Sequence, residues 1–466
     1  MAYKMLINGK LVDGNLTLDV INPATGAVLE VAPRADAAQL DEAVAAAKAA
    51  FPAWSALSFA ERGKAISAIA DALEARADEF ARLLTQEQGK PITQATGEVM
   101  GAMFGLRTFA AAEVGTKVLR ETESERILEQ RNPLGVVGAI MPWNFPVMLM
   151  AMKIGPALIT GNTVVAKPAP TTPLTSLLFA EMVADLLPPG VLNIIVDAND
   201  LGALMTKHPD IAKVSFTGST ATGKKVMESV ASSLKRLTLE LGGNDAAIVL
   251  DDVDVKKVAP QIFDAAMTNA GQICLATKRV YAPASLYDEL CNELAKLAGE
   301  AVVDDGLKQG TTIGPIQNKM QYEKVKAFLD DARANGKIIA GGGAVEREGY
   351  FIEPTIVRDI GDDTRLVREE QFGPVLPVLK YDDVNDAIAR ANDTDYGLGG
   401  TVWTSDVERG VAVASKVQSG TVWVNKWLDM PFDVPFRGAK SSGMGAENGQ
   451  EGIEEYTQAR IVNVAL

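Results

Sequence analysis

Apolar and polar residues recur at helical spacing in the segment from about residue 36 to residue 114. Within it, Ser58 and Glu61 form a capping box ahead of the apolar positions of FAERGKAISAIADALEARADEFARLL. The segment is therefore predicted to form a layer of alanine-rich helices.

Beyond residue 134, short apolar stretches alternate with helical ones. The sequence predicts strands at VVGAIM, TVVAK, VLNIIV and KVSFTG, with helices at TSLLFAEMVADLL and GKKVMESVASS. The alternation returns after residue 243, with strands at AAIVL, RVYAP, KIIAGG, GGTVWTS and GTVWVN, and helices through Phe263 to Asn269 and at SLYDELCNELAKLAG. Such alternation indicates parallel sheets covered by helices. The predicted fold class is α/β with two lobes, and we place their boundary near Gly242 and Gly243.

Two further segments, 115–133 and 455–466, alternate polar and apolar residues as strands do. Neither has an obvious partner in the two lobes. Because exposed strand edges are usually covered, we expect another subunit to cover them.

Composition narrows the classes of function. The 466 residues exceed what one hydrophobic core supports, and the formal charge of −15 disfavours nucleic acid and anionic membranes as partners. No stretch approaches the ~20 apolar residues that span a bilayer, and the N-terminus does not resemble a signal peptide. We expect a cytoplasmic protein. The single histidine, His208, precedes a predicted strand and is interpreted as structural, which excludes a Ser/His/Asp triad and a histidine-rich metal site.

The chain has two cysteines, which cannot form a disulfide framework. Cys274, in NAGQICLAT, follows a predicted helix, where backbone N–H groups can stabilise a thiolate and lower its pKa. The alternative is a small buried core residue. Cys291 lies on the apolar side of an amphipathic helix and is interpreted as packing.

Two other polar residues stand at positions suited to catalysis. Glu240 ends the apolar strand of LTLELGGN; a buried carboxyl there would act as a base, whereas an edge-strand glutamate would sit in solvent. Asn144, in MPWNFP, is bracketed by two prolines that stiffen its loop. A rigid amide donor suits an oxyanion hole, although asparagine also favours ordinary turns.

The segment VSFTGSTATGKK combines a strand, a glycine turn and the start of a helix, the arrangement that offers N–H groups to a phosphate. Gly218, Gly223 and Lys224 fit the spacing of a P-loop, which binds the phosphates of a nucleoside triphosphate. Lys225, however, stands where such a loop needs a Ser or Thr to ligate Mg²⁺, so an NTPase is the weaker interpretation.

Together and in this order, the motifs closely resemble the aldehyde dehydrogenase superfamily almost from end to end. The similarity is carried by MPWNFP, VVAKPAPTTP, FTGSTATG, LELGGN, GQIC, GYFIEPT, EEQFGPV and the region from NKWLDMPFDVPF to SSGMG. It implies a Rossmann-like cofactor domain with a five-stranded sheet, formed by residues 1–114 and 134–242. It also implies a catalytic domain at 243–445, and an oligomerisation arm at 115–133 and 446–466 that makes a homodimer or homotetramer.

The resemblance also implies roles in catalysis. Cys274 would be the nucleophile, Glu240 the general base, and Asn144 with the Cys274 backbone N–H the oxyanion hole. Lys153 and Glu447 resemble a proton-relay pair, with a surface ion pair as the alternative. The implied reaction is oxidation of an aldehyde through a thioester that water hydrolyses, and the presence of Glu240 argues against acyl transfer to coenzyme A.

For the cofactor, the resemblance implies that Lys167 contacts the adenosine ribose, that Ser219 and Trp143 neighbour the pyrophosphate and adenine side, and that Glu370 and Phe372 contact the nicotinamide ribose. Relatives that prefer NAD⁺ often carry a glutamate at the position of Pro170. Without it, both an acceptor for the ribose hydroxyls and a barrier to a 2′-phosphate are missing. We therefore expect both NAD⁺ and NADP⁺ to be used, unless a side chain distant in sequence fills the gap.

A substrate channel is predicted from small and apolar residues. Gly97, Gly101 and Gly105 repeat on one helix face, which indicates either close packing or a widened entrance. The other candidates are apolar: Phe145, Leu149, Met152, Trp427, Met430 and Phe436. They favour a bulky or aromatic aldehyde. Arg437 favours the alternative, an acid semialdehyde, and a non-catalytic scaffold is the alternative from a different class.

Overall fold

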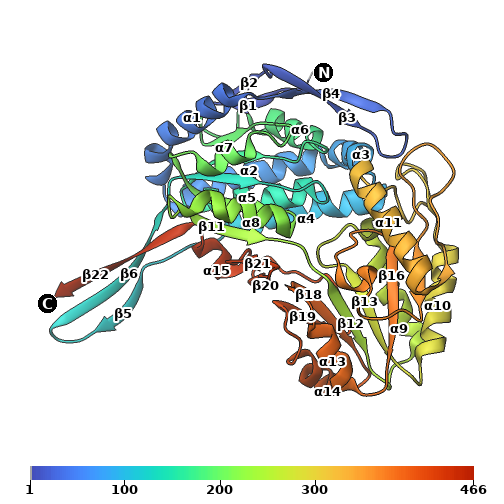
Figure 1. The fold of residues 1–466 in the computed structure, drawn as a ribbon. Coiled ribbons are helices and arrows are strands. Elements are labelled where there is room, and N and C mark those ends of the chain that lie inside the picture. Colours follow the sequence, from blue (N-terminus) through green and yellow to red (C-terminus); the bar gives the residue numbers. More distant parts are fainter. Residues whose placement is uncertain (1–2) are drawn as a thin grey trace.

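The computed structural model describes residues 3–466. Figure 1 shows two lobes, each built on its own sheet, and a narrow arm of strands that projects from the first lobe. The α/β fold class with two lobes is thereby confirmed. None of the described helices is both long and apolar enough to cross a bilayer.

The sheet of the first lobe has eight strands in the order β2-β1-β9-β8-β7-β10-β11-β21. The central five, β9 to β11 in this order, are parallel, and β1 and β21 add to the two edges in the antiparallel direction. The strands are β1 (Met5–Ile7), β2 (Lys10–Val12), β7 (Val136–Ile140), β8 (Thr163–Lys167), β9 (Leu192–Ile194), β10 (Ile211–Thr217), β11 (Arg236–Glu240) and β21 (Gly443–Met444).

Helices cover both faces of this sheet because successive strand residues point to opposite sides. In β8, Val164 and Ala166 join one apolar core, whereas Val165 joins the other. The helices are α1 (Ala37–Ser55), α2 (Phe59–Ala75), α3 (Ala77–Gln88), α4 (Ile92–Ala110), α5 (Pro146–Ile159), α6 (Leu174–Val183), α7 (Gly202–Lys207) and α8 (Thr220–Ala231). The predicted capping box of Ser58 and Glu61 is confirmed at the start of α2.

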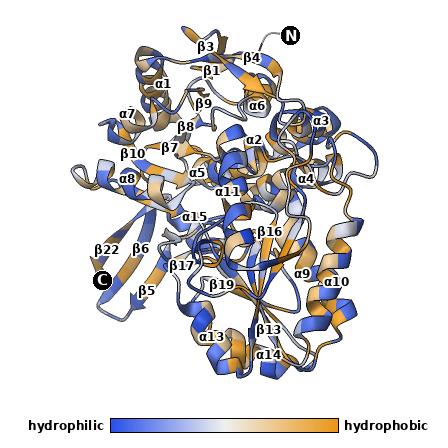
Figure 2. Ribbon diagram, turned by 45° about the vertical axis from the view of Figure 1, so that its right-hand side comes forward, coloured by the Kyte–Doolittle hydropathy of each residue, from blue (hydrophilic) through white to orange (hydrophobic). Residues whose placement is uncertain are grey.

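The sheet of the second lobe has seven strands in the order β14-β15-β16-β13-β12-β18-β19, of which only β14 is antiparallel to its neighbour. Its strands are β12 (Asp245–Val249), β13 (Thr277–Pro283), β14 (Lys337–Ala340), β15 (Thr355–Arg358), β16 (Val375–Tyr381), β18 (Gly399–Trp403) and β19 (Thr421–Val424). In Figure 2 the interior strand β16 is largely hydrophobic and the outer helix α13 is largely hydrophilic.

The helices after β12 are α9 (Val255–Met267), the 3₁₀ turn η1 (Thr268–Gly271), α10 (Tyr287–Glu300), α11 (Lys319–Asn335), α12 (Arg365–Arg368), α13 (Val384–Asn392), α14 (Val407–Ala414) and α15 (Gly449–Glu454). Two small antiparallel pairs complete the body: β3 (Leu16–Ile21) with β4 (Val28–Arg34), and β17 (Tyr396–Gly397) with β20 (Ala439–Lys440).

The arm consists of β5 (Lys117–Glu121), β6 (Glu125–Pro133) and β22 (Thr457–Ala465) in the order β22-β6-β5. β6 pairs along its full length with β22, although the two strands come from distant parts of the chain. Every residue of β5 is exposed, and hydrophobic positions remain on the projecting strands in Figure 2. The two segments predicted to be strands without a partner in either lobe therefore pair with each other.

Two details differ from the sequence analysis. The helix expected through Asn269 ends at Met267, because Asn269 and Ala270 adopt left-handed backbone conformations. β21 pairs with β11 of the first lobe, although residues up to 445 were assigned to the catalytic domain. A two-residue strand carries no hydrophobic period that could have revealed this pairing. The division into domains itself stays a prediction.

Candidate active site

Cys274 lies in an irregular loop between η1 and β13, not directly at the end of a helix. Lys278 holds this loop: its buried Nζ donates to the carbonyl oxygens of Ile273 at 2.9 Å, Cys274 at 2.7 Å and Ala276 at 3.1 Å. Three left-handed residues precede the loop, ending at Gly271. The position of the thiol is therefore set by backbone anchoring and not by a helix terminus.

The surroundings of Cys274 do not favour a thiolate. Burial raises the pKa of the Cys274 thiol to about 12; Lys278 lowers it, whereas Glu370, Asp245 and Glu240 raise it further. The lowered pKa expected from the sequence is therefore wrong for this state of the protein. Of these contributions, that of Glu240 is the smallest.

An apolar cluster surrounds Cys274. It contains side chains from several loops and strands: Phe145, Ile273, Leu275, Ala276, Leu398, Trp423, Leu428, Met430 and Phe436. Three of the predicted channel residues, Phe145, Met430 and Phe436, are thus brought to the cysteine. We name this group the thiol cluster.

Asn144 is buried beside the cysteine loop. Its Nδ2 donates to the carbonyl oxygen of Gln272 at 3.0 Å, and this bond uses one of the two amide protons. Its own backbone carbonyl accepts from Asn269 Nδ2 at 3.1 Å and from Lys90 Nζ at 2.8 Å. The amide is therefore fixed from both ends.

A buried ion pair supports the Asn144 loop. Lys90 and Glu98 are both completely buried, with Nζ and Oε2 2.5 Å apart. The other carboxylate oxygen of Glu98 accepts from the N–H groups of Val147 and Met148, at 2.9 and 3.2 Å, which begin α5. Burial lowers the pKa of Lys90, and Glu98 opposes that change.

Glu240 ends β11 and is buried, so the alternative of a solvent-exposed glutamate is wrong. Within residues 3–466, neither of its carboxylate oxygens has a hydrogen-bond partner. Burial raises its pKa well above the ordinary glutamate value; Glu447 raises it further and Lys153 lowers it. An unpaired buried carboxyl of this kind can accept a proton near neutral pH.

Lys153 and Glu447 form a buried ion pair, so the surface alternative is wrong here as well. Lys153 Nζ lies 2.6 Å from Glu447 Oε1 and donates to Ser215 Oγ at 3.1 Å. The hydroxyl of Tyr456 bonds to the same Ser215 oxygen at 3.2 Å. A chain of polar groups thus runs inward from the base of the arm to the neighbourhood of Glu240.

The segment with glycines at 218 and 223 lies at the carboxyl edge of the first sheet. The exposed Ser219 caps α8 by accepting from the N–H of Thr222 at 3.3 Å. A Cβ at Gly223 would lie 2.4 Å from Leu241, so glycine allows the helix to pack closely on the sheet. β7 lies between β8 and β10, which is the topological switch point where parallel α/β sheets bind ligands.

Lys167 ends β8 at the same edge, and Pro170 follows it partly exposed. The Lys167 side chain does not point freely into solvent. Its Nζ lies 2.7 Å from Asp197 Oδ1 in a buried pair, and Asp197 Oδ2 accepts from the N–H of Leu201 at 3.1 Å.

Glu370 and Phe372 come from the second lobe. Glu370 Oε1 accepts from the N–H of Gly243 at 3.0 Å, and a Cβ on Gly242 would lie 2.4 Å from its other oxygen, so glycine makes room for this carboxyl. Burial raises the pKa of Glu370. The ring of Phe372 meets Trp143 edge to face, with centroids 5.3 Å apart. Trp143 therefore lies beside the residue expected at the nicotinamide ribose.

The remaining apolar residues predicted to line the substrate channel do not pack beside Cys274 but in the cores of the two lobes. Leu149 and Met152 pack with the core of the first lobe, and Trp427 packs with the core of the second, while Leu428 takes the place expected for Trp427 in the thiol cluster. The glycines of α4 also differ: among residues 3–466, nothing lies within 4 Å of a Cβ at Gly97. Met148 Sδ would lie 3.1 Å from a Cβ at Gly101, and Phe432 would lie 2.8 Å from one at Gly105. Close packing explains Gly105, whereas Gly97 faces open space.

A family model described as "Aldehyde dehydrogenase family" matches residues 11–462. The chain belongs to the aldehyde dehydrogenase family. Known aldehyde dehydrogenases are similar over nearly their whole length: the NADP⁺ succinate-semialdehyde dehydrogenase GabD of Escherichia coli is 37% identical, covering 99% of this chain and 97% of the relative. Geranial dehydrogenase of Castellaniella defragrans is 36% identical, covering 95% and 94%. The NAD⁺ complex of an aldehyde dehydrogenase from Bacillus cereus has a TM-score of 0.98 at 36% identity, covering 100% of this chain and 97% of that one.

This dehydrogenase is therefore an NAD(P)-dependent enzyme that acts on an aldehyde. The scaffold and NTPase alternatives receive no support from these relatives. Two residues interpreted as structural also have ordinary surroundings: Cys291 is fully buried in the second core, and His208 lies 3.3 Å from the exposed Asp41.

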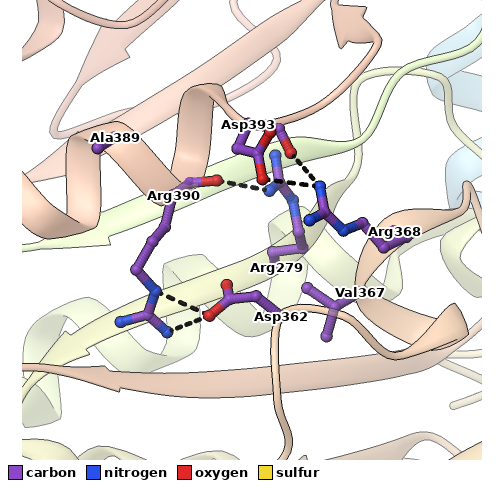
Figure 3. A pocket seen from close by; sticks show the side chains of 7 residues that line it. All are labelled: Arg279, Asp362, Val367, Arg368, Ala389, Arg390 and Asp393. Atoms are coloured by element: carbon purple, nitrogen blue, oxygen red, sulfur yellow. Dashed lines mark hydrogen bonds and ion pairs between the residues drawn. The ribbon is translucent and has the colours of Figure 1, made fainter.

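A cavity in the second lobe of the dehydrogenase is separate from these residues. It has a volume of about 240 Å³ and is lined by Arg279, Asp362, Val367, Arg368, Ala389, Arg390 and Asp393 (Figure 3). Its guanidinium groups are already engaged: Arg390 pairs with Asp362 at 2.8 Å, and Arg368 pairs with Asp393 at 2.9 Å. The cavity contains none of the candidate catalytic or cofactor residues.

Sequence reasoning missed several residues that position the site. Lys278 has no motif that would distinguish it from a surface lysine at the start of a strand. Lys90 and Glu98 lie eight positions apart, which is not a helical pairing distance, and Asp197 is far from Lys167 in the sequence. Only the burial of these charges in the folded protein reveals their importance.

Proposed function

We propose that this dehydrogenase oxidises a bulky apolar aldehyde to a carboxylic acid through a thioester on Cys274, which water hydrolyses with Glu240 as base. The observation that carries the proposal is the buried carboxyl of Glu240, which has no hydrogen-bond partner among residues 3–466, together with a cysteine that packs against an apolar cluster. A carboxyl without partners costs stability, and a role as a proton acceptor accounts for it.

In the first half of the reaction, the Cys274 thiol gives its proton to a water molecule and its sulfur attacks the aldehyde carbon, whose carbonyl electrons move to the oxygen. Negative charge then develops on the aldehyde oxygen. We assign the second amide proton of Asn144 and the Cys274 backbone N–H to this oxygen, because donors that are fixed in advance stabilise the charge without reorganisation. Lys90 and Asn269 hold the Asn144 loop in place for that role. The oxygen electrons then re-form the carbonyl as the aldehyde hydrogen leaves as a hydride, which a bound nicotinamide would accept, and Cys274 is left carrying the thioester.

In the second half, Glu240 removes a proton from water, which attacks the thioester carbon, and the Cys274 sulfur leaves with the released electron pair. The carboxyl must then return its proton to solvent. Lys153 and Glu447 are the proposed relay, since both act on the pKa of Glu240. Lys153 also donates to Ser215 Oγ, which in turn bonds to the hydroxyl of Tyr456.

For the cofactor we propose a dinucleotide along the carboxyl edge of the first sheet. The residues fit such a group, because the N–H groups at the start of α8 favour a phosphate at Ser219, Gly218 and Gly223, and Lys167 ends a neighbouring strand. Glu370 and Phe372, with Trp143, would hold the nicotinamide end. When bound, the nicotinamide would accept a hydride. Without an acidic residue at Pro170, we propose that both NAD⁺ and NADP⁺ support turnover, with kcat/KM values within roughly two decades.

For the substrate we propose a bulky or aromatic aldehyde, based on the apolar thiol cluster. Arg437, which could have favoured a carboxylate, pairs with Glu451 in an exposed position. The relatives include both a geranial and a succinate-semialdehyde dehydrogenase, so an acid semialdehyde is the second candidate.

The exposed strands of the arm support a homodimer or homotetramer, and the two unbonded cysteines support the cytoplasm as the compartment. The oxidation reaction is tested by following reduced cofactor with a panel of aldehydes and both dinucleotides, for the native enzyme and for Cys274→Ala. We expect turnover only with the cysteine present. Turnover by the variant above a trace would overturn the thioester mechanism.

A further inference from the structure

The carboxyl edge of the first sheet, where we propose that the dinucleotide binds, contains an ion pair that the sequence did not indicate. Lys167 Nζ and Asp197 Oδ1 are 2.7 Å apart, and 4% of the Lys167 side chain and none of the Asp197 side chain is exposed. Asp197 is fixed by a second bond, from the N–H of Leu201 to its other oxygen. The Lys167 ammonium is therefore held by a carboxylate whose orientation is fixed by a second hydrogen bond.

The position of the pair matters because of the order of the strands. Lys167 ends β8 and Asp197 follows β9, while α8 begins after β10, with β7 in between. Neighbouring strands are about 4.8 Å apart, so the end of β8 lies roughly 10 Å from the end of β10. A dinucleotide whose diphosphate lies at the start of α8 has its adenosine ribose within this span.

We propose that Asp197 is a positioning residue that makes the enzyme favour NAD⁺ over NADP⁺ by committing the Lys167 ammonium. This inference rests on the proposed cofactor site and sets the direction of the limited preference proposed above. A 2′-phosphate is stabilised by a cation that no neighbouring carboxylate neutralises. Here the charge of Lys167 is balanced by a buried carboxylate, which would also repel the phosphate. A ribose hydroxyl needs only one N–H donor, which a paired lysine can still supply.

The pair also explains how an enzyme without an acid at Pro170 can still discriminate. Asp197 places a carboxylate beside the same lysine from a neighbouring strand. The Asp197 side chain is fully buried and that of Lys167 is 4% exposed, so Asp197 would act on a bound cofactor through the lysine.

The test measures binding of 5′-ADP and 2′,5′-ADP by calorimetry, so it does not depend on turnover. In Asp197→Asn we expect the ratio of the two Kd values to shift towards 2′,5′-ADP by about tenfold or more, since the lysine charge is freed. Adding Lys167→Met to this variant should abolish the gain. Asp200→Asn is the matched control: Asp200 is an exposed neighbouring carboxylate paired with Arg34, and its loss should leave the ratio unchanged.

The outcomes separate the two proposals. If the native enzyme binds neither nucleotide, the cofactor site itself is wrong. If 5′-ADP binds normally but the ratio in Asp197→Asn stays within twofold of the native value, the role of Asp197 is overturned. Should that variant lose 5′-ADP binding, Asp197→Ser removes the carboxylate with a smaller side chain, and the same ratio decides. Binding of 5′-ADP serves as the check on folding in the Asp197→Asn, Asp197→Ser and Asp200→Asn variants, which retain Lys167.

Discussion

Lys153 and Glu447 are separated by 294 positions in the sequence, yet their side chains meet at 2.6 Å inside the protein. Lys153 lies in α5 of the first lobe, and Glu447 lies between β21 and α15 near the end of the chain. The pair therefore joins the start of the candidate proton path to the C-terminal segment.

Breaking this pair should cost both stability and turnover. Lys153→Met leaves Glu447 without its cation beside a second buried carboxyl, so we expect a loss of about 3–5 kcal/mol in the free energy of unfolding. Lys153→Met with Glu447→Leu should recover most of that loss, because both charges are then replaced by apolar groups. Urea unfolding measures both effects. Lys48→Met, at an exposed pair with Asp210, should cost less than about 1 kcal/mol.

The double variant also tests the relay. It should fold but turn over slowly in the steady state, because Glu240 has no partner to take its proton. Steady-state rates equal to those of the native enzyme would show that the pair is structural.

Glu240→Gln should retain a single burst of reduced cofactor and lose steady-state turnover, because an amide keeps the shape but cannot accept a proton. In the native enzyme the base works only when deprotonated. Since burial raises the pKa of Glu240, steady-state turnover should be low at pH values below that raised pKa and should increase as the pH rises through it. Stopped-flow absorbance at several pH values measures both. Loss of the burst itself would mean that Glu240 also takes the Cys274 proton.

Cys274 should react slowly with alkylating agents when no cofactor is bound. Because burial raises its pKa to about 12, the thiolate fraction, and with it the rate, should grow by about tenfold per pH unit between pH 7 and 10. Iodoacetamide labelling followed by mass spectrometry measures the rate, and Cys274→Ala gives the background from the buried Cys291. A plateau below pH 9 would contradict the raised pKa.

The thiol cluster should favour benzaldehyde over both acetaldehyde and succinic semialdehyde in kcat/KM. Phe436→Ala should lower the value for benzaldehyde by about 10-fold or more and affect acetaldehyde less, because a small substrate does not fill the same space. Arg437→Ala should leave the order of substrates unchanged, since Arg437 is engaged with Glu451. A higher value for succinic semialdehyde in the native enzyme would support the acid-semialdehyde alternative.

The arm should mediate assembly. Val118 and Ile461 are more than half exposed in the single chain, so charging them costs the isolated subunit little. We expect Val118→Lys with Ile461→Lys to lower the mass measured by light scattering at micromolar concentration. Met320→Lys, at an apolar and still more exposed position on α11, should leave it unchanged. A native enzyme that is already monomeric would refute the arm as an interface.

Most of the fold could be predicted from the sequence because the spacing of apolar and polar residues in a helix or strand depends only on residues close together in the chain. The strands around Val164 and the capping box of Ser58 are set by neighbouring residues, and so is the amphipathic helix that buries Cys291. The family motifs likewise identified Cys274, Glu240 and Asn144 as candidates, and their chemical roles stay predictions.

What the sequence could not predict depends on contacts between distant segments. The raised pKa of Cys274 comes from the burial of its loop, which no spacing encodes. Leu428 packs with the thiol cluster and Trp427 with the core of the second lobe, and this difference depends on how their loop packs against distant segments. The Lys167 and Asp197 pair depends on which strands are neighbours in the sheet.

The pairing of β6 with β22 has a consequence for how the chain folds as it is made. β22 (residues 457–465) follows every strand and helix of the second lobe in the chain, so the ribosome must make that lobe before β6 can gain this partner. Until then, the growing chain presents β6 with an open edge, a feature that favours mispairing between chains. Emergence of β22 from the ribosome therefore both completes the arm and ends the period in which this edge is exposed.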